Sequence, residues 1–177
     1  MGDVWRISDL AKAVTSLEGL KGNAVITREK GLRNLTQKLP FSPASREGRA
    51  DLYAEDTIAA IRLVQIAGDM GLGRAELADL TFRLTSEEPL AEKVKVEGGW
   101  TRPHRIALMV QRAKAGETFN LRIGRTVHGH KIYSYGLSKN SVVEAIYESA
   151  DAELKPVAVL EIHASQLISD LLGALKG

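Results

Sequence analysis

Five basic and amide residues between positions 30 and 38 have a spacing that could serve recognition chemistry on one side of a helix. They are Lys30, Arg33, Asn34, Gln37 and Lys38. On a helix these side chains would lie opposite Leu32, Leu35 and Leu39. Arg and Lys bind phosphates and guanine, and Asn or Gln can form two hydrogen bonds with adenine. The pattern predicts a helix that fits a nucleic-acid groove; the alternative is a solvated helix face.

A second basic segment follows shortly after this expected helix. Arg46 and Arg49 stand on either side of Gly48, and a glycine at this point allows a tight reversal of the chain. Arginines at the tip of such a reversal could contact phosphates. A mobile basic loop is the alternative for this segment alone. The helix and the loop together favour a surface for a polyanion over two unrelated features.

The charge distribution along the chain adds slight support. Residues 1–49 carry nine Lys or Arg and five Asp or Glu, whereas residues 50–99 carry five and ten, and residues 100–177 carry ten and seven. The net charge of +2 therefore hides a basic N-terminal segment and an acidic middle. We expect the N-terminal segment to face the polyanion.

The sequence gives little indication of catalytic or metal-binding motifs. His128 and His130 would point to the same side of a strand and could ligate a metal, but no neighbouring His, Cys or acidic residue completes a site, and Gly129 favours a turn. His104 and His163 are single histidines. No phosphate-binding loop, dinucleotide fingerprint or nucleophile motif is found. We therefore expect that the protein is not an enzyme and that it has no catalytic residue, no metal and no cofactor.

Hydrophobic periodicity predicts the elements that would position these side chains. Apolar residues at helical spacing predict helices at 7–14 and 24–39, the second with a possible break at Gly31, and a helix pair over 54–84. The first helix of that pair is apolar around most of its circumference, with one narrow polar stripe of Arg62, Gln65 and Asp69. Such a helix is buried between other elements, so we expect it to be the spine of its domain.

The second half of the chain has a different pattern. Residues 85–103 read as a linker because of their Gly, Pro and Glu content. Beyond them we expect a helix over 106–113, a strand over 119–124 and a hairpin partner at 131–135. A helix that begins near Ser141, a strand at 157–162 and a terminal helix at 167–175 complete the prediction.

Composition limits the cellular setting. No apolar run approaches the ~20 residues of a membrane span, so we expect no membrane contact. The N-terminus lacks the basic-then-apolar pattern of a secretory signal, and the chain has no cysteine. These features favour a cytoplasmic protein.

Four stretches in the first half carry a family resemblance. They are ISDLAKAV (7–14), ITREKGL (26–32), SREGRADLYAEDT (45–57) and IRLVQIAGDMGLGRAELADL (61–80). Their order resembles the DNA-binding domain of MerR-like winged-helix regulators over residues 5–84. The resemblance implies a mainly α fold with small β content. It places a winged helix-turn-helix domain at 1–84, before a linker at 85–103 and a small α+β domain at 104–177.

The resemblance and the residue pattern place the DNA-reading helix differently. The family would put it near 24–30, which adds Thr27 and Arg28 to the candidates, whereas the basic stripe favours 30–38. The connection over 15–23 is longer than the family's tight turn, and residues 33–44 are additional. Both positions keep Arg28, Lys30 and Arg33 close to the expected interface.

The function expected from the sequence is a sequence-specific DNA-binding transcriptional regulator that contacts double-stranded DNA. Its C-terminal domain would serve dimerisation or signal input. The family's long dimerisation helix is missing, so we expect a homodimer through 104–177, including the apolar face of the terminal helix. The alternatives are a protein–protein adaptor module on a winged-helix scaffold, and an α/β ligand-binding or enzymatic domain over 104–177.

Overall fold

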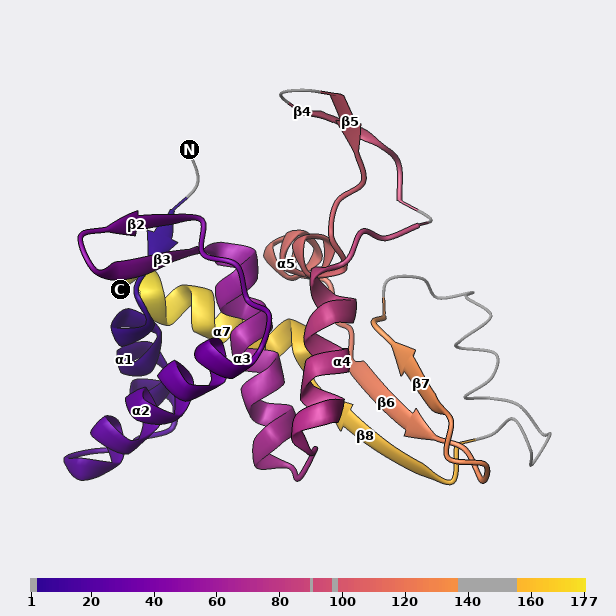
Figure 1. The fold of residues 1–177 in the computed structure, drawn as a ribbon, viewed down its shortest axis with the longest axis horizontal. Coiled ribbons are helices and arrows are strands. Elements are labelled where there is room, and N and C mark those ends of the chain that lie inside the picture. The colour runs from indigo at the N-terminus through magenta and orange to yellow at the C-terminus, as the bar shows by residue number, and fades with distance from the viewer. Residues whose placement is uncertain (1–2, 90, 97–98, 137–155) are drawn as a thin grey trace.

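The structure is a computed structural model that describes residues 3–89, 91–96, 99–136 and 156–177. It mixes helices with small antiparallel sheets (Figure 1). The first half comprises β1 (Val4–Trp5), α1 (Ile7–Leu17), α2 (Asn23–Lys38), β2 (Ser45–Glu47), β3 (Ala50–Ala54), α3 (Glu55–Asp69) and α4 (Arg74–Thr85). The second half comprises β4 (Val94–Val96), β5 (Gly99–Thr101), α5 (Arg105–Lys114), β6 (Leu121–Arg125), β7 (Lys131–Ser134), β8 (Ala158–Ile162) and α7 (Ala164–Lys176).

The helix predictions for the first half are confirmed, with one exception. α2 runs without interruption through Gly31, so the predicted break there is wrong. Gly31 keeps an ordinary helical backbone, and the space around it is open. The helix tolerates the roughly 1 kcal/mol cost of an internal glycine because its neighbouring turns are anchored to α1 and α3.

A three-stranded sheet with the order β1-β3-β2 lies beside these helices. β2 and β3 form a hairpin in which Glu47 pairs with Ala50 across the two-residue turn Gly48–Arg49. Gly48 has φ +60°, the left-handed backbone that such a turn requires at its first position. The reversal predicted at Gly48 is confirmed. The sequence analysis missed β1, which is two residues long and pairs Trp5 with Tyr53.

α3 is the spine of the fold, as its apolar pattern predicted. Ile58, Ile61, Leu63 and Val64 on this helix have no exposed surface. α3 contacts α2 and α4 in the first half of the chain and α5 and α7 in the second. The hydrophobic core is therefore one cluster that draws residues from both halves.

The segment expected to be a linker contains a β-hairpin. We name residues 91–96 and 99–102 the arm; here β4 and β5 pair with each other, with Lys95 opposite Trp100. The arm projects from the upper side of the molecule in Figure 1. Its base is closed by hydrogen bonds, one from the Glu88 amide to the Pro103 carbonyl (2.9 Å) and one from the Arg105 amide to the Ser86 carbonyl (3.0 Å).

The C-terminal sheet has the order β7-β6-β8, all antiparallel, and confirms the predicted strands. Tyr133 of β7 donates a hydrogen bond to the Asp79 carboxylate of α4 (2.6 Å), and Arg83 lies over its ring. Burial and this hydrogen bond raise the pKa of the Tyr133 hydroxyl. The contact joins the sheet to the first half of the chain. The helix predicted near Ser141 lies outside the described residues.

α7 returns to the N-terminal half and packs against α1, α3 and α5. Ile168, Leu171 and Leu172 are buried, and Leu167 and Leu175 pack at the edge of the same core. We expected one flank of this helix to be free for a partner subunit. The structure instead uses the apolar face within the chain, because α1 and α3 supply the surface that covers it. None of the helices in the described part of the chain has the length and hydropathy that a bilayer crossing requires.

The role of α3 predicts a large effect of truncating its buried side chains. Ile61→Ala should lower the free energy of unfolding by about 2–5 kcal/mol, because it removes a fully buried side chain and leaves a cavity. Chemical denaturation measures this. Met70→Ala is the control, since Met70 ends the same helix with 54% of its surface exposed. A loss at Ile61 no larger than at Met70 would contradict the spine assignment.

Candidate nucleic-acid interface

The position of α2 is set by a cluster of charged side chains from three helices. Glu18, at the C-terminal end of α1, accepts hydrogen bonds from Arg62 of α3 (2.9 Å) and from Arg28 of α2 (2.8 and 3.0 Å). Arg28 also pairs with Asp69 of α3 (2.9 Å). Gln65 accepts a hydrogen bond from Arg62 and donates one to Asp69. We call these five residues the ionic clamp.

Separating the groups of the ionic clamp would cost free energy, because it would leave a buried charge without its partner. The Arg62 side chain is 6% exposed, so its charge needs Glu18 and Gln65 nearby. Its Nε is buried and has no hydrogen-bond partner among the described residues. Burial lowers the pKa of Arg28, but Asp69 and Glu18 outweigh that effect and the pKa is raised overall. Loss of one carboxylate would leave a buried arginine without its full counter-charge, which would destabilise the folded state.

The stripe predicted on α2 faces outward. Lys30, Arg33, Asn34, Gln37 and Lys38 are all exposed, and we call them the α2 outer stripe. On the opposite side Leu32 is buried in the core and Leu35 is half-buried. Arg33 pairs with Glu29 one turn earlier on the helix (2.6 Å). Lys30 and Lys38 have no ion pair with any described residue.

The two candidates that came from the family resemblance lie elsewhere on α2. Thr27 is exposed, and its hydroxyl donates to the Asn23 carbonyl of the preceding turn (3.1 Å). Arg28 points toward α1 and α3, where the ionic clamp holds it, and its side chain is 24% exposed. Arg28 therefore positions the helix and is not part of its outer surface. The outward-facing residues begin at Asn23 and Thr27 and continue through the α2 outer stripe.

The β2–β3 hairpin presents one arginine without an ion pair among the described residues. Arg49 occupies the turn. Arg46 pairs with Asp51 on the neighbouring strand (2.6 Å), and the hydrogen bond to this carboxylate raises the Arg46 pKa. Glu47 pairs with Arg6, which precedes α1. These contacts are on the surface, so they cost little to exchange for phosphate contacts.

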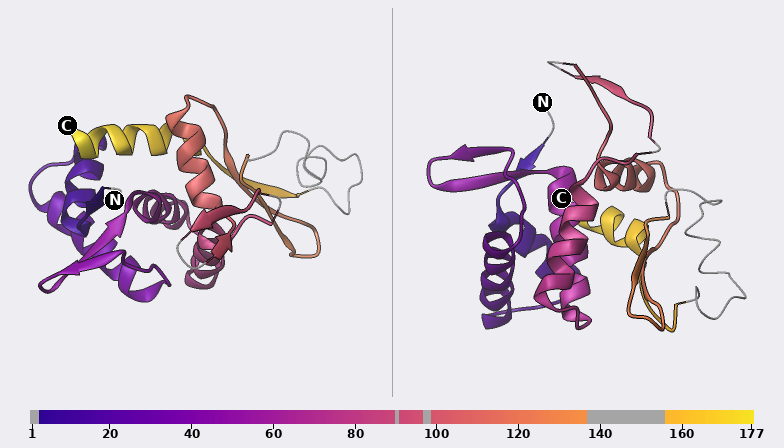
Figure 2. Two further views of the ribbon diagram at one scale, coloured as in Figure 1. Left: turned by 90° about the horizontal axis from the view of Figure 1, so that it is seen from above. Right: turned by 45° about the vertical axis from the view of Figure 1, so that its right-hand side comes forward.

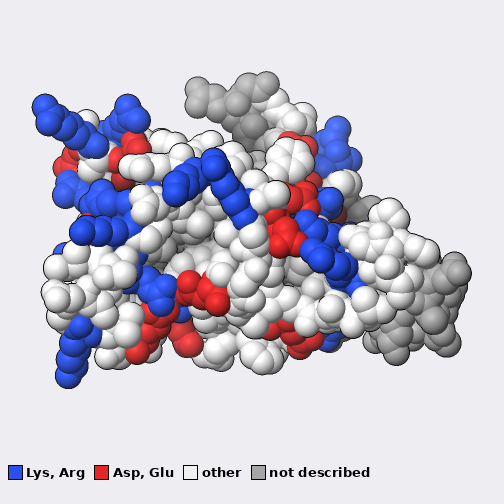
Figure 3. All heavy atoms as spheres, turned by 60° about the horizontal axis from the view of Figure 1, so that its bottom comes forward, with Lys and Arg blue, Asp and Glu red and all other residues white. Residues whose placement is uncertain are grey.

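The α2 outer stripe and the hairpin belong to the same end of the molecule. Seen from above in Figure 2, the hairpin and the last turns of α2 lie on the side away from α7. Lys and Arg side chains project from this end, the left-hand part of Figure 3. A groove of about 620 Å³ separates α2 from α3. Apolar side chains such as Leu20, Leu32 and Leu35 line it together with Thr27 and the clamp residues Arg28, Gln65 and Asp69.

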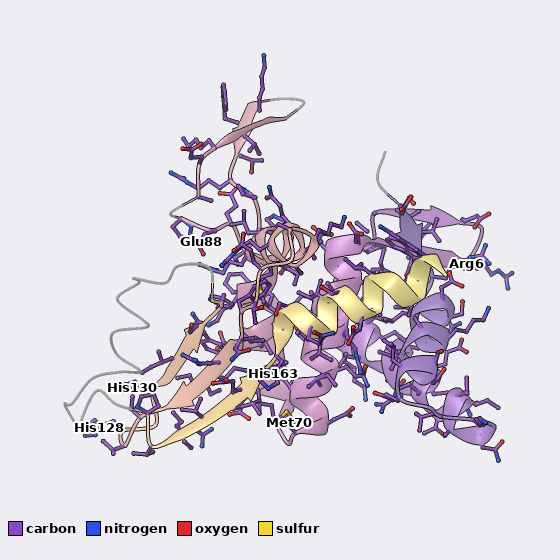
Figure 4. The ribbon with its side chains drawn as sticks, turned by 180° about the vertical axis from the view of Figure 1, so that it is seen from behind. Arg6, Met70, Glu88, His128, His130 and His163 are labelled. Carbon is purple, nitrogen blue, oxygen red and sulfur yellow. The ribbon has the colours of Figure 1, made fainter. Side chains whose placement is uncertain are left out.

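The histidines lie away from this end. His128 and His130 sit at the turn between β6 and β7, with ring centroids 6.5 Å apart, and His163 precedes α7 (Figure 4). Among residues 3–89, 91–96, 99–136 and 156–177 no three His, Cys, Asp or Glu side chains form a group that could hold a metal ion.

Comparison with known proteins adds no relative: no family model matches the chain, and no curated protein or solved structure shows significant similarity to it. The geometry of the chain itself therefore carries the functional argument.

Sequence reasoning missed Glu18 and gave Arg28 to the wrong surface. The one signal available was the polar stripe of Arg62, Gln65 and Asp69 on an otherwise apolar helix. Three polar groups on a buried helix need partners, and a basic residue on α2 together with an acidic residue at the end of α1 could supply them.

The ionic clamp predicts strong coupling between Glu18 and Arg62. In a double-mutant cycle with Glu18→Gln and Arg62→Met, we expect a coupling free energy of about 1.5–3 kcal/mol, because the Arg62 charge is buried. The exposed pair of Glu29 and Arg33 is the control and should couple by about 0.3–0.5 kcal/mol. Urea denaturation measures both cycles. Equal coupling in the two pairs would show that the contact of Glu18 with Arg62 stabilises the fold no more than a surface ion pair does.

Proposed function

We propose that this chain is a sequence-specific DNA-binding protein that regulates transcription, with α2 in the major groove and the β2–β3 hairpin against the backbone. The observation that carries the proposal is the exposure of α2. Within this helix only Leu32 is buried, and the outward side presents Lys, Arg, Asn and Gln over about two and a half turns. These side chains combine phosphate binding with the hydrogen-bond donors and acceptors that read base edges.

The element order supports a winged helix-turn-helix of the MerR-like kind as part of this proposal. α1 and α2 pack together, the hairpin follows, and α3 and α4 form the next helix pair. The pairing of β1 with β3 attaches the hairpin to the chain just before α1. A hairpin fixed in this way would work as a wing because its tip stays at a constant distance from α2.

We assign roles within the interface according to whether each side chain already has a partner in the described part of the chain. Lys30, Lys38 and Arg49 would bind phosphates directly, since none has an ion pair with a described residue. Arg33 and Arg46 would exchange Glu29 and Asp51 for DNA. Asn34 and Gln37 would read bases. The protein would act in the cytoplasm without a cofactor, as a homodimer that doubles the number of contacts.

A protein–protein adaptor is the second candidate. The apolar groove between α2 and α3 favours it, because side chains such as Leu20 and Leu35 offer a surface for an apolar segment of a partner. The salt dependence of the binding affinity distinguishes the two functions. Binding through several phosphates weakens steeply as salt rises, whereas binding through an apolar groove changes little.

The wing assignment predicts a change in the salt dependence of DNA binding. Arg46→Ala with Arg49→Ala should weaken binding to unrelated duplexes to a similar extent and lower the slope of log K against log salt by roughly 1 per lost contact. Fluorescence anisotropy over a salt series measures the slope. Arg74→Ala on α4 removes an exposed arginine outside the proposed interface and should leave the slope unchanged. An unaltered slope in the double variant would exclude the hairpin from the interface.

A further inference from the structure

The arm carries an exposed tryptophan that the DNA-binding proposal does not use. Trp100 keeps 67% of its surface exposed and does not belong to the hydrophobic core. It lies directly opposite Lys95, so the two side chains share one face of the β4–β5 ribbon. Lys93 precedes β4 and is exposed. The arm therefore presents an indole with Lys95 beside it, and a second lysine comes just before the strand.

The arm is held at its base in a defined position. Arg105 pairs with Glu88 (3.0 Å) and donates a hydrogen bond to the Arg83 carbonyl (2.9 Å), and both side chains of the pair are less than one-fifth exposed. The Arg102 side chain donates to the Ala91 carbonyl across the arm (3.2 Å). A projecting ribbon with a fixed base and an exposed tryptophan is built to reach another surface.

A groove suited to this face lies on the same side of the molecule. It has a volume of about 580 Å³ between the β1–β3–β2 sheet and α5, and its floor is apolar, with Val4, Ala54, Ala107 and Val110. Its charged lining residues are Asp3, Asp56, Glu55 and Lys114. Lys114 pairs with Glu55, whereas Asp3 and Asp56 have no ion pair with a described residue. The arm, β3, the start of α3 and α5 all lie along the upper side in Figure 1.

We propose that the groove receives the arm of a second copy of this chain, with Trp100 on the apolar floor and Lys93 and Lys95 against Asp3 and Asp56. The chemistry is complementary, since an indole with cations meets an apolar floor with carboxylates. The arm leads directly into α5, which forms one wall of the groove. Arm and groove are therefore adjacent on each copy, and reciprocal exchange about a two-fold axis closes a dimer.

This inference identifies the surface for the homodimer in the proposed function. It replaces the apolar face of α7, which packs within its own chain. The groove is distinct from the α2 outer stripe and from the hairpin turn at Arg49. The dimer can therefore form without DNA, and its test needs none.

Sedimentation equilibrium of the full chain without DNA, from submicromolar to high micromolar concentration, tests the proposal. We expect a monomer–dimer equilibrium that Trp100→Ala weakens by about 30-fold, as for a central tryptophan in an interface. Phe82→Ala is the matched control, because Phe82 is equally exposed (66%) but lies on α4, and it should not change the equilibrium. A wild-type chain that stays monomeric, or a dimer that Trp100→Ala leaves intact, would overturn the proposal.

Charge reversal tests where the arm docks. Lys95→Glu and Asp3→Lys should each weaken the dimer about tenfold, and the double variant should recover to within about threefold of wild type. Both positions are exposed, so neither change threatens the fold. Additive weakening without recovery would place the arm on another surface and reject this groove.

Trp100 fluorescence distinguishes a second copy from other occupants. In a Trp5→Phe background Trp100 is the only tryptophan of the chain. We expect its emission to shift to the blue as protein concentration rises. An emission maximum that is already blue and independent of concentration would mean that the arm folds onto its own chain. A shift that requires added duplex would mean that the arm contacts DNA. Either result would overturn the dimer.

Discussion

The interaction on which the architecture most depends is the contact of Arg62 with Glu18. Arg62 is a charged residue on the most deeply buried helix, and the acceptors that stabilise it come from the end of α1 and from its own helix. Glu18 in turn holds Arg28, so the same carboxylate fixes α2. α2 buries only Leu32, which alone would leave its rotation weakly determined. Ionic contacts thus orient the helix whose outer stripe we assign to DNA. The residues that orient α2 are therefore separate from those of its outer stripe.

Local signals explain how much of this fold the sequence predicts. The apolar periodicity of α3 identifies the buried spine, since that pattern depends only on neighbouring residues. The turn at Gly48 is predicted for the same reason. The strand β1 is missed because two residues carry no periodicity. They form a strand only by pairing with β3, where Trp5 lies opposite Tyr53. The candidate site follows the same rule: the α2 outer stripe is read from its spacing, but Arg28 is misplaced because its partner Asp69 lies 41 positions away.

The second half of the chain is more tightly joined to the first than its sequence suggests. α7 completes the core around α1 and α3, and Tyr133 bonds to Asp79 on α4. Because Ile168, Leu171 and Leu172 of α7 are buried within the chain, we place the proposed dimer surface on the arm. The expected linker could not reveal this, because short strands with Gly, Glu and Lys resemble a connection until they pair.

We propose that the outer stripe of α2 reads DNA sequence. Selection of bound fragments from random duplex DNA at near-physiological salt tests it most directly, with the wild-type chain and Asn34→Ala compared. We expect the wild type to enrich one short motif. Asn34→Ala should enrich the same motif with the preference lost at a single base pair, because Asn34 contacts bases and carries no charge. A wild-type pool that remains as random as the starting duplexes would show that α2 does not read DNA sequence.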